Sequence, residues 1–381
     1  MPDEEGVVYR VDGPPGAPVL VMVGSLGTTG EVWDGQVPVL RQWLRALRVE
    51  HPGHGGAAVP AGRGSLEALG ERLVRLLDTL QVPRASFAGL SLGGQICMWV
   101  AVHHPDRVDH LVISCSVPRF GSPRTYAERA VAVRERGTQH LVDGAISRWF
   151  TDQLPISQPG TPAKYREMLA AVDPEGYAYC CEAVAGADLS GDVSRLTAPT
   201  LLVGGGSDPV VTPDMLASFA TQVKGAMLCI LPGAAHLANV EQPGAFNDVL
   251  VNHLLGSAAT RGRKVREAVL GAEHVARALG EATELTADFQ DLLTRWPWGD
   301  IWARPGLDVA TRRLLTIALL VALNRPEELE MHIRGALESG VTQGELKEVL
   351  MHTAVYAGIP AANSAFAIAG RVAREHGRPG T

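Results

Sequence analysis

A serine between two glycines is the first residue whose setting suggests chemistry. The stretch AGLSLGG (88–94) places Gly89, Ser91 and Gly93 in the pattern Gly-x-Ser-x-Gly, after an apolar run and before a helix-like segment. On a sharp strand-to-helix turn this pattern exposes the serine hydroxyl as a nucleophile, and the glycines let neighbouring backbone pass without a Cβ clash. The alternative is an ordinary glycine-rich turn.

A serine hydroxyl is a useful nucleophile only beside a base, and a carboxylate must orient that base. The expected order along the chain is serine, acid, histidine. Asp208 ends the run TLLVGGGSD and His236 follows the next apolar run, so both are expected at the carboxyl edge of a sheet. Roles as a turn former and a loop polar residue remain open for them. The histidines that fit this order less well are His51, His54, His103 and His104.

Acyl transfer at such a serine also needs hydrogen-bond donors for the oxyanion that forms on the substrate. The backbone N–H of Leu92, directly after the nucleophile, is expected to be one donor. The other is expected from the loop after the apolar run VLVMVG, where the N–H of Leu26 is the candidate. We predict no metal site.

A second set of chemical side chains lies in the last third of the chain. His332 and His352 fall on successive predicted helices, and Glu348 precedes His352 by four residues, so these two could orient each other. Arginines that could hold a carboxylate are Arg304, Arg312, Arg313 and Arg334. From the residues alone, we favour the interpretation that these side chains are exposed surface residues or core histidines over a role in a chemical site.

The serine, aspartate and histidine require a sheet that brings their loops together. Short apolar runs predict buried strands at residues 19–24, 85–90, 110–115, 200–205 and 226–231. Between them, Ser65–Leu80 and Leu92–His104 have helix-like patterns. This alternation predicts an α/β fold with a mostly parallel sheet covered on both faces. Residues 118–189 break the rhythm and are predicted to form a helical cap.

The rest of the chain shows no strand pattern. Residues 256–263 have linker composition, and helices are predicted at 264–279, 308–323, 327–339, 343–357 and 361–375. Gly340 is predicted as a C-terminal cap, and Thr342 with Glu345 as a capping box. Pro360 is predicted to break the chain before the last helix.

We therefore expect two domains, at residues 1–257 and 264–381, of which the second is small and all-helical. The second contains a long apolar helix, LLTIALLVAL. Such a helix is expected to bury its apolar surface against copies of the same chain. The predicted assembly is a homo-oligomer formed through the C-terminal helical domain.

Composition limits the class of protein. Of 381 residues 46% are hydrophobic and 20% charged, so a packed core is expected rather than disorder. A net charge of −7 without a concentrated basic segment argues against a nucleic-acid partner. The five irregularly spaced cysteines fit reduced thiols. The acidic start MPDEEG and the lack of an apolar run of about 20 residues predict a cytoplasmic protein without a membrane segment.

The first part of the chain resembles the α/β-hydrolase fold, and within it the 3-oxoadipate enol-lactonases. The resemblance lies in the ordered segments VGSLGTTGEVWDGQVPVL, RALRVEHPGHG, AGLSLGG, GGGSDPVVTP and AAHLANVEQP. One departure is that relatives usually carry an aspartate and an arginine where this chain has His51 and Pro52. This puts in doubt a substrate contact through that arginine, and leaves the triad unaffected. Trp149 of the cap is a candidate contact for a substrate ring, with packing as the alternative.

The tail is similar to the carboxymuconolactone decarboxylase family in GDIWARPGLD, HIRGAL and HTAVYAG. A redox branch of that family uses a CxxC motif, but this domain contains no cysteine. The resemblance therefore implies the 4-carboxymuconolactone decarboxylase branch, whose reaction needs no cofactor. It implies His332 as electrophile or proton donor, with His352 or Glu348 as the second acid–base group and Arg304 as a carboxylate anchor.

Together the two resemblances imply a bifunctional enzyme of protocatechuate breakdown, similar to known fusions of these activities. The decarboxylase product is an enol-lactone, which the hydrolase would open to 3-oxoadipate. The partners implied are small lactones. An alternative is a general serine esterase or perhydrolase whose helical tail only drives oligomerisation. A dehalogenase-like hydrolase has little support, because that chemistry uses a carboxylate where this chain has Ser91.

Overall fold

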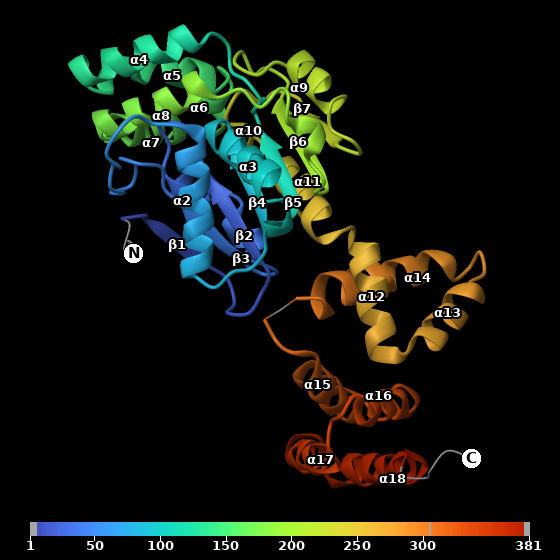
Figure 1. The fold of residues 1–381 in the computed structure, drawn as a ribbon. Coiled ribbons are helices and arrows are strands. Elements are labelled where there is room, and N and C mark those ends of the chain that lie inside the picture. The colour runs from blue at the N-terminus through green and yellow to red at the C-terminus, as the bar shows by residue number, and fades with distance from the viewer. Residues whose placement is uncertain (1–5, 305, 377–381) are drawn as a thin grey trace. The chain divides into compact units, whose positions relative to one another are not determined.

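The computed structural model describes residues 6–304 and 306–376, and these divide into two units, Met1–Leu254 and Leu255–Thr381 (Figure 1). In the described part of unit 1, a sheet has seven strands in the order β1-β3-β2-β4-β5-β6-β7. All neighbours pair in parallel except β1 with β3. The strands are β1 Tyr9–Asp12, β2 Val19–Val23, β3 Arg45–Val49, β4 Ala85–Leu90, β5 Val108–Ser114, β6 Thr200–Gly205 and β7 Met227–Leu231.

The predicted α/β fold with a mostly parallel sheet is confirmed, with corrections to three of its strands. The short strand β1 was not predicted, because Arg10 and Asp12 interrupt its apolar residues. The strand β3 was not predicted, because Arg45 and Arg48 interrupt its apolar residues; Arg48 pairs with Asp12 of β1 at 2.7 Å. The strand β7 was predicted to be buried, but it is an edge strand, and Met227 is 50% exposed.

Helices cover both faces of this sheet, as its apolar strands require. Ser65 begins α2 (Leu66–Thr79) by accepting a hydrogen bond from the backbone N–H of Ala68. The helix α3 (Leu92–His103) follows Ser91 directly and is buried almost throughout. The other helices outside the cap are α1 Val37–Leu40, α9 Pro213–Ala220, α10 Ala238–Glu241 and α11 Pro243–Leu255.

A group of helices between β5 and β6 forms a cap over the end of the sheet that carries Ser91 (Figure 1). The helix α4 packs along α8. The helices of the cap are α4 Pro123–Arg136, α5 Val142–Trp149, α6 Leu154–Ser157, α7 Thr161–Ala170 and α8 Pro174–Gly186.

Unit 2 is helical in all its described elements. The helices α15–α18 share one apolar core that includes Ile317, Ile333 and Leu350. The helix α12 packs on η5, a π-helix, where a Cβ on Gly262 would lie 1.8 Å from the Thr294 carbonyl oxygen. The elements are α12 Ala258–Leu270, α13 Ala272–Gly280, α14 Ala287–Leu293, η5 Thr294–Trp302, α15 Val309–Ala322, α16 Pro326–Glu338, α17 Gln343–Ala357 and α18 Ile359–His376.

The helix boundaries of unit 2 agree with the sequence signals from α15 onward. Before it, the helices α14 and η5 were not predicted. The Thr342–Glu345 capping box is present, and Gly340 has the positive φ of 94° expected after a helix. The predicted helix 264–279 is instead two helices, because Gly271 adopts a φ of 87°. Most of the stretch 256–263, whose composition suggested a linker, lies in α12.

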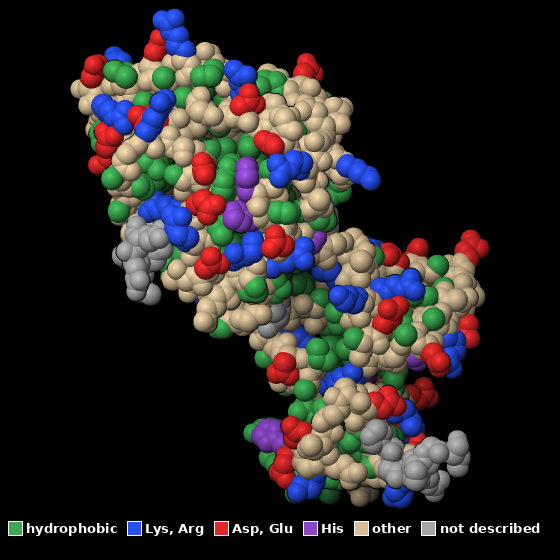
Figure 2. All heavy atoms as spheres, viewed as in Figure 1, with side chains coloured by type: hydrophobic (Ala, Val, Ile, Leu, Met, Phe, Trp, Pro, Cys, Tyr) green, Lys and Arg blue, Asp and Glu red, His purple; other side chains and the backbone are tan. Residues whose placement is uncertain are grey.

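The surface and the helices bear on the predicted partners. On the face shown in Figure 2, Lys and Arg side chains are interspersed with Asp and Glu side chains on each unit. This face therefore offers no continuous basic surface for nucleic acid. Within the residues described, no helix combines the length and apolar character needed to cross a bilayer.

Candidate active sites

Ser91 lies on a strained turn between β4 and α3, with φ 55° and ψ −114°. A side chain at Gly89 would place its Cβ 2.2 Å from the Gly93 carbonyl oxygen. One at Gly93 would place its Cβ 2.2 Å from the carbonyl oxygen of Val23 on β2. Since backbone atoms cannot move aside as a flexible side chain can, both flanking positions require glycine. The turn thus holds the Ser91 side chain at the end of the sheet.

Ser91, His236 and Asp208 form a continuous chain of hydrogen bonds. The Ser91 Oγ lies 2.9 Å from His236 Nε2, and His236 Nδ1 lies 2.9 Å from Asp208 Oδ2. The other Asp208 oxygen, Oδ1, accepts from the backbone N–H groups of Val210 and Val211 at 2.8 and 3.1 Å. These bonds fix the carboxylate, which in turn fixes the His236 ring with Nε2 facing the hydroxyl.

Two backbone N–H groups are available at the same place for an oxyanion. Leu92 is the first residue of α3, and Leu26 lies in the loop after β2; both line the cavity above Ser91. Within the described residues, neither N–H donates a hydrogen bond. The loops are held together because the Gly93 N–H donates to the Gly24 carbonyl at 3.1 Å.

Two buried histidines that the sequence analysis set aside hold the Leu26 loop. His51 donates from Nε2 to the Gly24 carbonyl oxygen at 2.8 Å. His54 accepts the Gly27 N–H on Nε2 at 3.0 Å and donates from Nδ1 to the Pro52 carbonyl at 2.8 Å. Both rings therefore hold the loop in position. The contacts join residues 27 positions apart, so a local sequence pattern does not predict this role.

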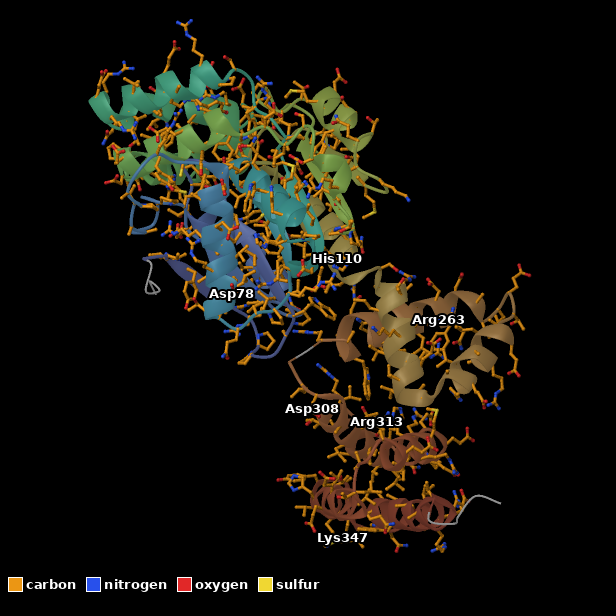
Figure 3. The ribbon with its side chains drawn as sticks, in the orientation of Figure 1. Asp78, His110, Arg263, Asp308, Arg313 and Lys347 are labelled. Carbon is orange, nitrogen blue, oxygen red and sulfur yellow. The ribbon has the colours of Figure 1, made fainter. Side chains whose placement is uncertain are left out.

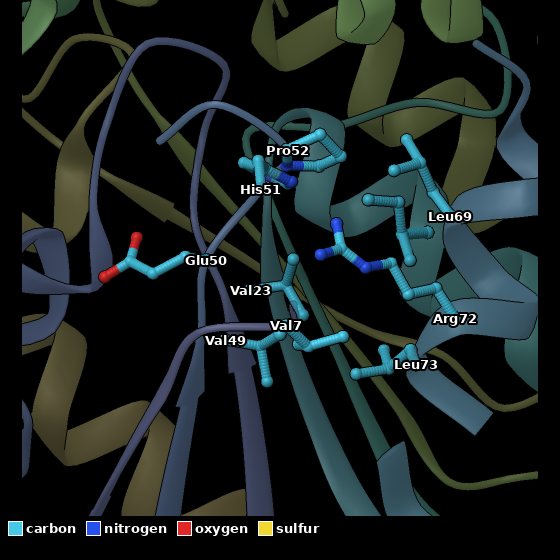
Figure 4. A pocket seen from close by; sticks show the side chains of 10 residues that line it. Val7, Val23, Val49, Glu50, His51, Pro52, Leu69, Arg72 and Leu73 are labelled. Carbon is cyan, nitrogen blue, oxygen red and sulfur yellow. The ribbon is translucent and has the colours of Figure 1, made fainter. Parts of the chain in front are cut away.

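These hydrogen bonds suit neutral imidazoles. Burial, opposed by the bond to Gly24, lowers the pKa of His51 to about 4. Burial, and then the neighbouring His51, lowers the pKa of His54 to about 3. Arg72 extends from α2 toward His51 (Figure 4) and adds a like charge that also disfavours protonation of His51. Both histidines are consequently uncharged near neutral pH.

A cavity of about 260 Å³ lies between the cap and the sheet. Ser91 and His236 line its floor, and Trp149, Arg129 and Arg148 contribute from the cap. Trp149 thus lines the cavity, and its contact with a substrate ring stays a prediction. The two arginines were not predicted, because they are 38 or more residues from Ser91 and belong to no motif.

The end of α5 is joined to the loop that carries the histidine. The His236 N–H donates to the Arg148 carbonyl at 3.4 Å, and the Leu237 N–H donates to the Trp149 carbonyl at 3.0 Å. A movement of the cap at α5 would therefore move the His236 backbone as well.

The described donor set at this site favours hydrogen bonding over metal binding. Cys115, Asp208 and His236 have donor atoms within 4.8 Å of one another and are all buried. Burial, and then the charge of Asp208, raises the pKa of the Cys115 thiol to about 12, whereas a metal ligand would be a thiolate. The ring nitrogens of His236 are already engaged by Asp208 and Ser91.

In unit 2, His332 is buried in a setting that leaves one ring nitrogen without a partner. Its exposed fraction is 8%, and Nδ1 makes no hydrogen bond within the described residues. The ring stacks on Trp302, with centroids 6.2 Å apart. Burial, and then the like charge of Arg313, lowers the pKa of His332 to about 4. A neutral imidazole next to a buried cation is the result.

Arg313, on α15, is a buried cation with donor groups that lack partners in the described residues (Figure 3). It is 2% exposed, and its Nε and one terminal nitrogen have no partner in the described part of the chain. The other terminal nitrogen donates to the Ala268 carbonyl at 3.3 Å. A buried guanidinium with free donors can accept an anion such as a carboxylate.

The other predicted residues of unit 2 do not join His332. The buried side chains of α17 include Leu346 and Leu350, so Glu348 and His352 face solvent. Glu348 pairs with Lys347 at 3.1 Å and not with His352, whose ring contacts Tyr356.

Arg304, the predicted carboxylate anchor, is also exposed. Its carbonyl oxygen accepts from Arg312. Of the four arginines noted in the sequence, Arg313 is buried, whereas the predicted anchor Arg304 is exposed.

Comparisons with known proteins agree with this division. Residues 18–243 match the family described as "alpha/beta hydrolase fold", and residues 287–371 match "Carboxymuconolactone decarboxylase family". The first part is 34% identical to 3-oxoadipate enol-lactonase 2 of Acinetobacter baylyi, over 63% of this chain and 89% of that protein. The last part is 46% identical to 4-carboxymuconolactone decarboxylase of the same organism, over 31% of this chain and 87% of that protein.

Among solved structures, the enol-lactonase from Burkholderia xenovorans LB400 matches with a TM-score of 0.63. It is 35% identical in sequence, and the match covers 65% of this chain and 96% of that one. The similarity is therefore to nearly the whole of that protein.

Proposed function

Because the chain belongs to the α/β-hydrolase fold family, and its C-terminal part to the carboxymuconolactone decarboxylase family, we propose that it catalyses two consecutive steps. Unit 2 decarboxylates 4-carboxymuconolactone to 3-oxoadipate enol-lactone, and unit 1 hydrolyses that lactone to 3-oxoadipate. The observation that carries the proposal is the hydrogen-bond chain from Ser91 through His236 to Asp208. The names of the relatives supply the substrates.

In unit 1, Ser91 Oγ attacks the lactone carbonyl while His236 Nε2 takes its proton. The oxyanion accepts hydrogen bonds from the N–H groups of Leu26 and Leu92. Collapse of this intermediate opens the ring, and His236 returns the proton to the leaving enol oxygen. A water molecule, deprotonated by His236, then releases the acyl group from Ser91, and the enol converts to the ketone of 3-oxoadipate.

In unit 2, the substrate itself holds the electrons that carbon dioxide leaves behind. They delocalise through the ring double bond onto the lactone carbonyl, so the reaction needs no cofactor. The anion requires a donor at its oxygen and a proton at the distal carbon. We assign the donor or proton-transfer role to His332, and the carboxylate contact to Arg313 in place of the exposed Arg304.

The proposal is tested by incubating the full chain with 4-carboxymuconolactone and following carbon dioxide and 3-oxoadipate separately. Ser91→Ala is expected to release carbon dioxide and accumulate the enol-lactone, with hydrolysis reduced by roughly 10⁴-fold or more. His332→Ala is expected to slow carbon dioxide release by roughly 10²- to 10⁴-fold while supplied enol-lactone is still hydrolysed.

The matched controls are His140→Ala on the cap and His274→Ala in unit 2, both outside the proposed sites. No carbon dioxide from the unmodified chain would contradict the decarboxylase assignment. Hydrolysis that persists in Ser91→Ala would contradict the hydrolase assignment.

A second candidate is a serine esterase whose helical unit serves only to associate copies of the chain. Exposed apolar side chains on two helices of unit 2 favour it: Leu319 is 61% and Val355 77% exposed. Both candidates include a homo-oligomer formed through this unit. They differ in carbon dioxide release, which the esterase would not show.

A further inference from the structure

The cavity above Ser91 contains two arginines of the cap, Arg129 on α4 and Arg148 on α5. Both side chains are half-buried. In the described part of the chain, neither forms an ion pair with a carboxylate. The cavity therefore holds two positive charges without a protein countercharge.

Each arginine lines the cavity in a different local setting. The Arg129 guanidinium lies over the Tyr126 ring, 4.9 Å from its centroid. Tyr126 and Tyr177 line the same cavity. The backbone of Arg148 is joined to the His236 loop, since its carbonyl accepts from the His236 N–H. The aromatic contact holds the Arg129 cation without neutralising it.

Other arginines of the cap behave differently. Three of them pair with carboxylates on the cap surface at 2.6–2.7 Å: Arg124 with Glu128, Arg134 with Glu175 and Glu182, and Arg166 with Asp143. Among the described residues, the cap therefore supplies acids for these three surface arginines but none for the two in the cavity. Burial, and then the like charge of Arg129, lowers the pKa of Arg148.

We propose that Arg129 and Arg148 form a carboxylate-binding subsite, so that the hydrolase prefers lactones and esters that carry a free carboxylate a few bonds from the scissile carbonyl. The inference rests on the proposed hydrolase function and deepens it. A bound carboxylate neutralises the two like charges and accepts charge-assisted hydrogen bonds from them. It also directs the carbonyl toward Ser91, which lines the same cavity. The cavity volume of about 260 Å³ suits a small molecule rather than a long acyl chain.

The first test measures kcat/KM of the full chain for two substrates, the carboxylate-bearing enol-lactone and the neutral ester p-nitrophenyl acetate. Arg129→Met and Arg148→Met are each expected to lower the ratio of the anionic to the neutral value by roughly 10- to 100-fold. The loss should be mainly in KM, and Lys at either position should restore part of it. Arg136→Met, an exposed arginine on α4 outside the cavity, is the control and should leave the ratio unchanged.

The second test uses glutarate as a competitive inhibitor of p-nitrophenyl acetate hydrolysis, so it does not depend on the enol-lactone. Glutarate should inhibit the unmodified chain, and its inhibition constant should rise roughly 10- to 100-fold in each Met variant. If the enol-lactone is not hydrolysed but this shift occurs, the proposed substrate fails and the subsite stands. An unchanged inhibition constant, or equal losses for both substrates, would overturn the subsite.

Discussion

At the scale of single residues, the hydrolase site depends on buried side chains whose charge state is set by burial. His51 and His54 hold the Leu26 loop as neutral rings, since His54 must accept from the Gly27 N–H. A protonated His54 has no acceptor nitrogen and would release that loop. The position of the Leu26 N–H, which we propose as an oxyanion donor, is thereby linked to two side chains outside the lining of the cavity.

We expect the stability of the chain to fall in mild acid because of these histidines. Their pKa values are about 4 and 3 when folded, against 6.5 for an unperturbed histidine. The unfolded state therefore binds more protons as pH falls from 6.5 toward 4, and each histidine lowers the unfolding free energy by about 1.4 kcal/mol per pH unit in that window. Denaturant unfolding at several pH values measures this slope.

The single variants His51→Gln and His54→Gln keep hydrogen-bonding groups but do not titrate. Each should make the slope between pH 6.5 and 4 shallower by about 1.4 kcal/mol per unit. His140→Gln, an exposed histidine of the cap, should keep the original slope. Equal slopes in all four proteins would contradict the assignment of the acid sensitivity to the buried pair.

At the scale of elements, close helix approach depends on glycine where local propensity alone would favour another residue. Gly70 lies inside α2, and a Cβ there would be 2.0 Å from Cε3 of Trp99 on α3. The two helices pack against each other through this contact. Since α3 follows Ser91 directly, the packing of α2 on α3 supports the turn that carries Ser91.

Gly70→Ala is expected to destabilise the chain by about 1–3 kcal/mol, because Trp99 must shift to admit the methyl group. Replacing glycine by alanine inside a helix usually raises stability, so the loss expected here has the opposite sign. Gly244→Ala in α11 is the matched control, because a Cβ added there has no neighbour within 4 Å. The stability of this variant should equal or slightly exceed that of the unmodified chain. Thermal unfolding of both variants measures these changes in stability. A Gly70→Ala variant more stable than the unmodified chain would refute the packing argument.

At the scale of the whole molecule, unit 2 carries exposed apolar side chains on two of its helices. In unit 2, the apolar side chains of Leu315 and Leu319 on α15, and of Leu323 directly after it, recur every four residues and are at least half exposed. On α17, Val355 and Tyr356 are more than three-quarters exposed. Apolar surface of this extent is typical of a protein interface.

We expect the chain to associate with copies of itself through α15 and α17. Sedimentation equilibrium should give a mass that is a multiple of the 40.4 kDa monomer. Leu319→Glu and Val355→Glu should shift the mass toward the monomer, because a carboxylate would be buried without a partner. Leu285→Glu, at a 91% exposed position outside these helices, should not. A monomer at micromolar concentration without substitution would contradict the interface.

The sequence by itself determined the features that depend on neighbouring residues. The apolar strand runs, the turn at Ser91 and the Thr342–Glu345 capping box each lie within a few residues, so local pattern predicts them. The sequence also predicts that Ser91, Asp208 and His236 meet, because the carboxyl ends of parallel strands lie at one edge of the sheet. The predicted fold and both family resemblances are confirmed.

Only the tertiary structure decided which polar groups are buried together. It places His51 and His54 beneath the Leu26 loop, and Arg129 and Arg148 in one cavity, although no spacing relates them. In unit 2 it buries His332 and leaves His352 in solvent. The physical reason is that burial and charge compensation depend on contacts between distant segments, which a local sequence pattern does not contain.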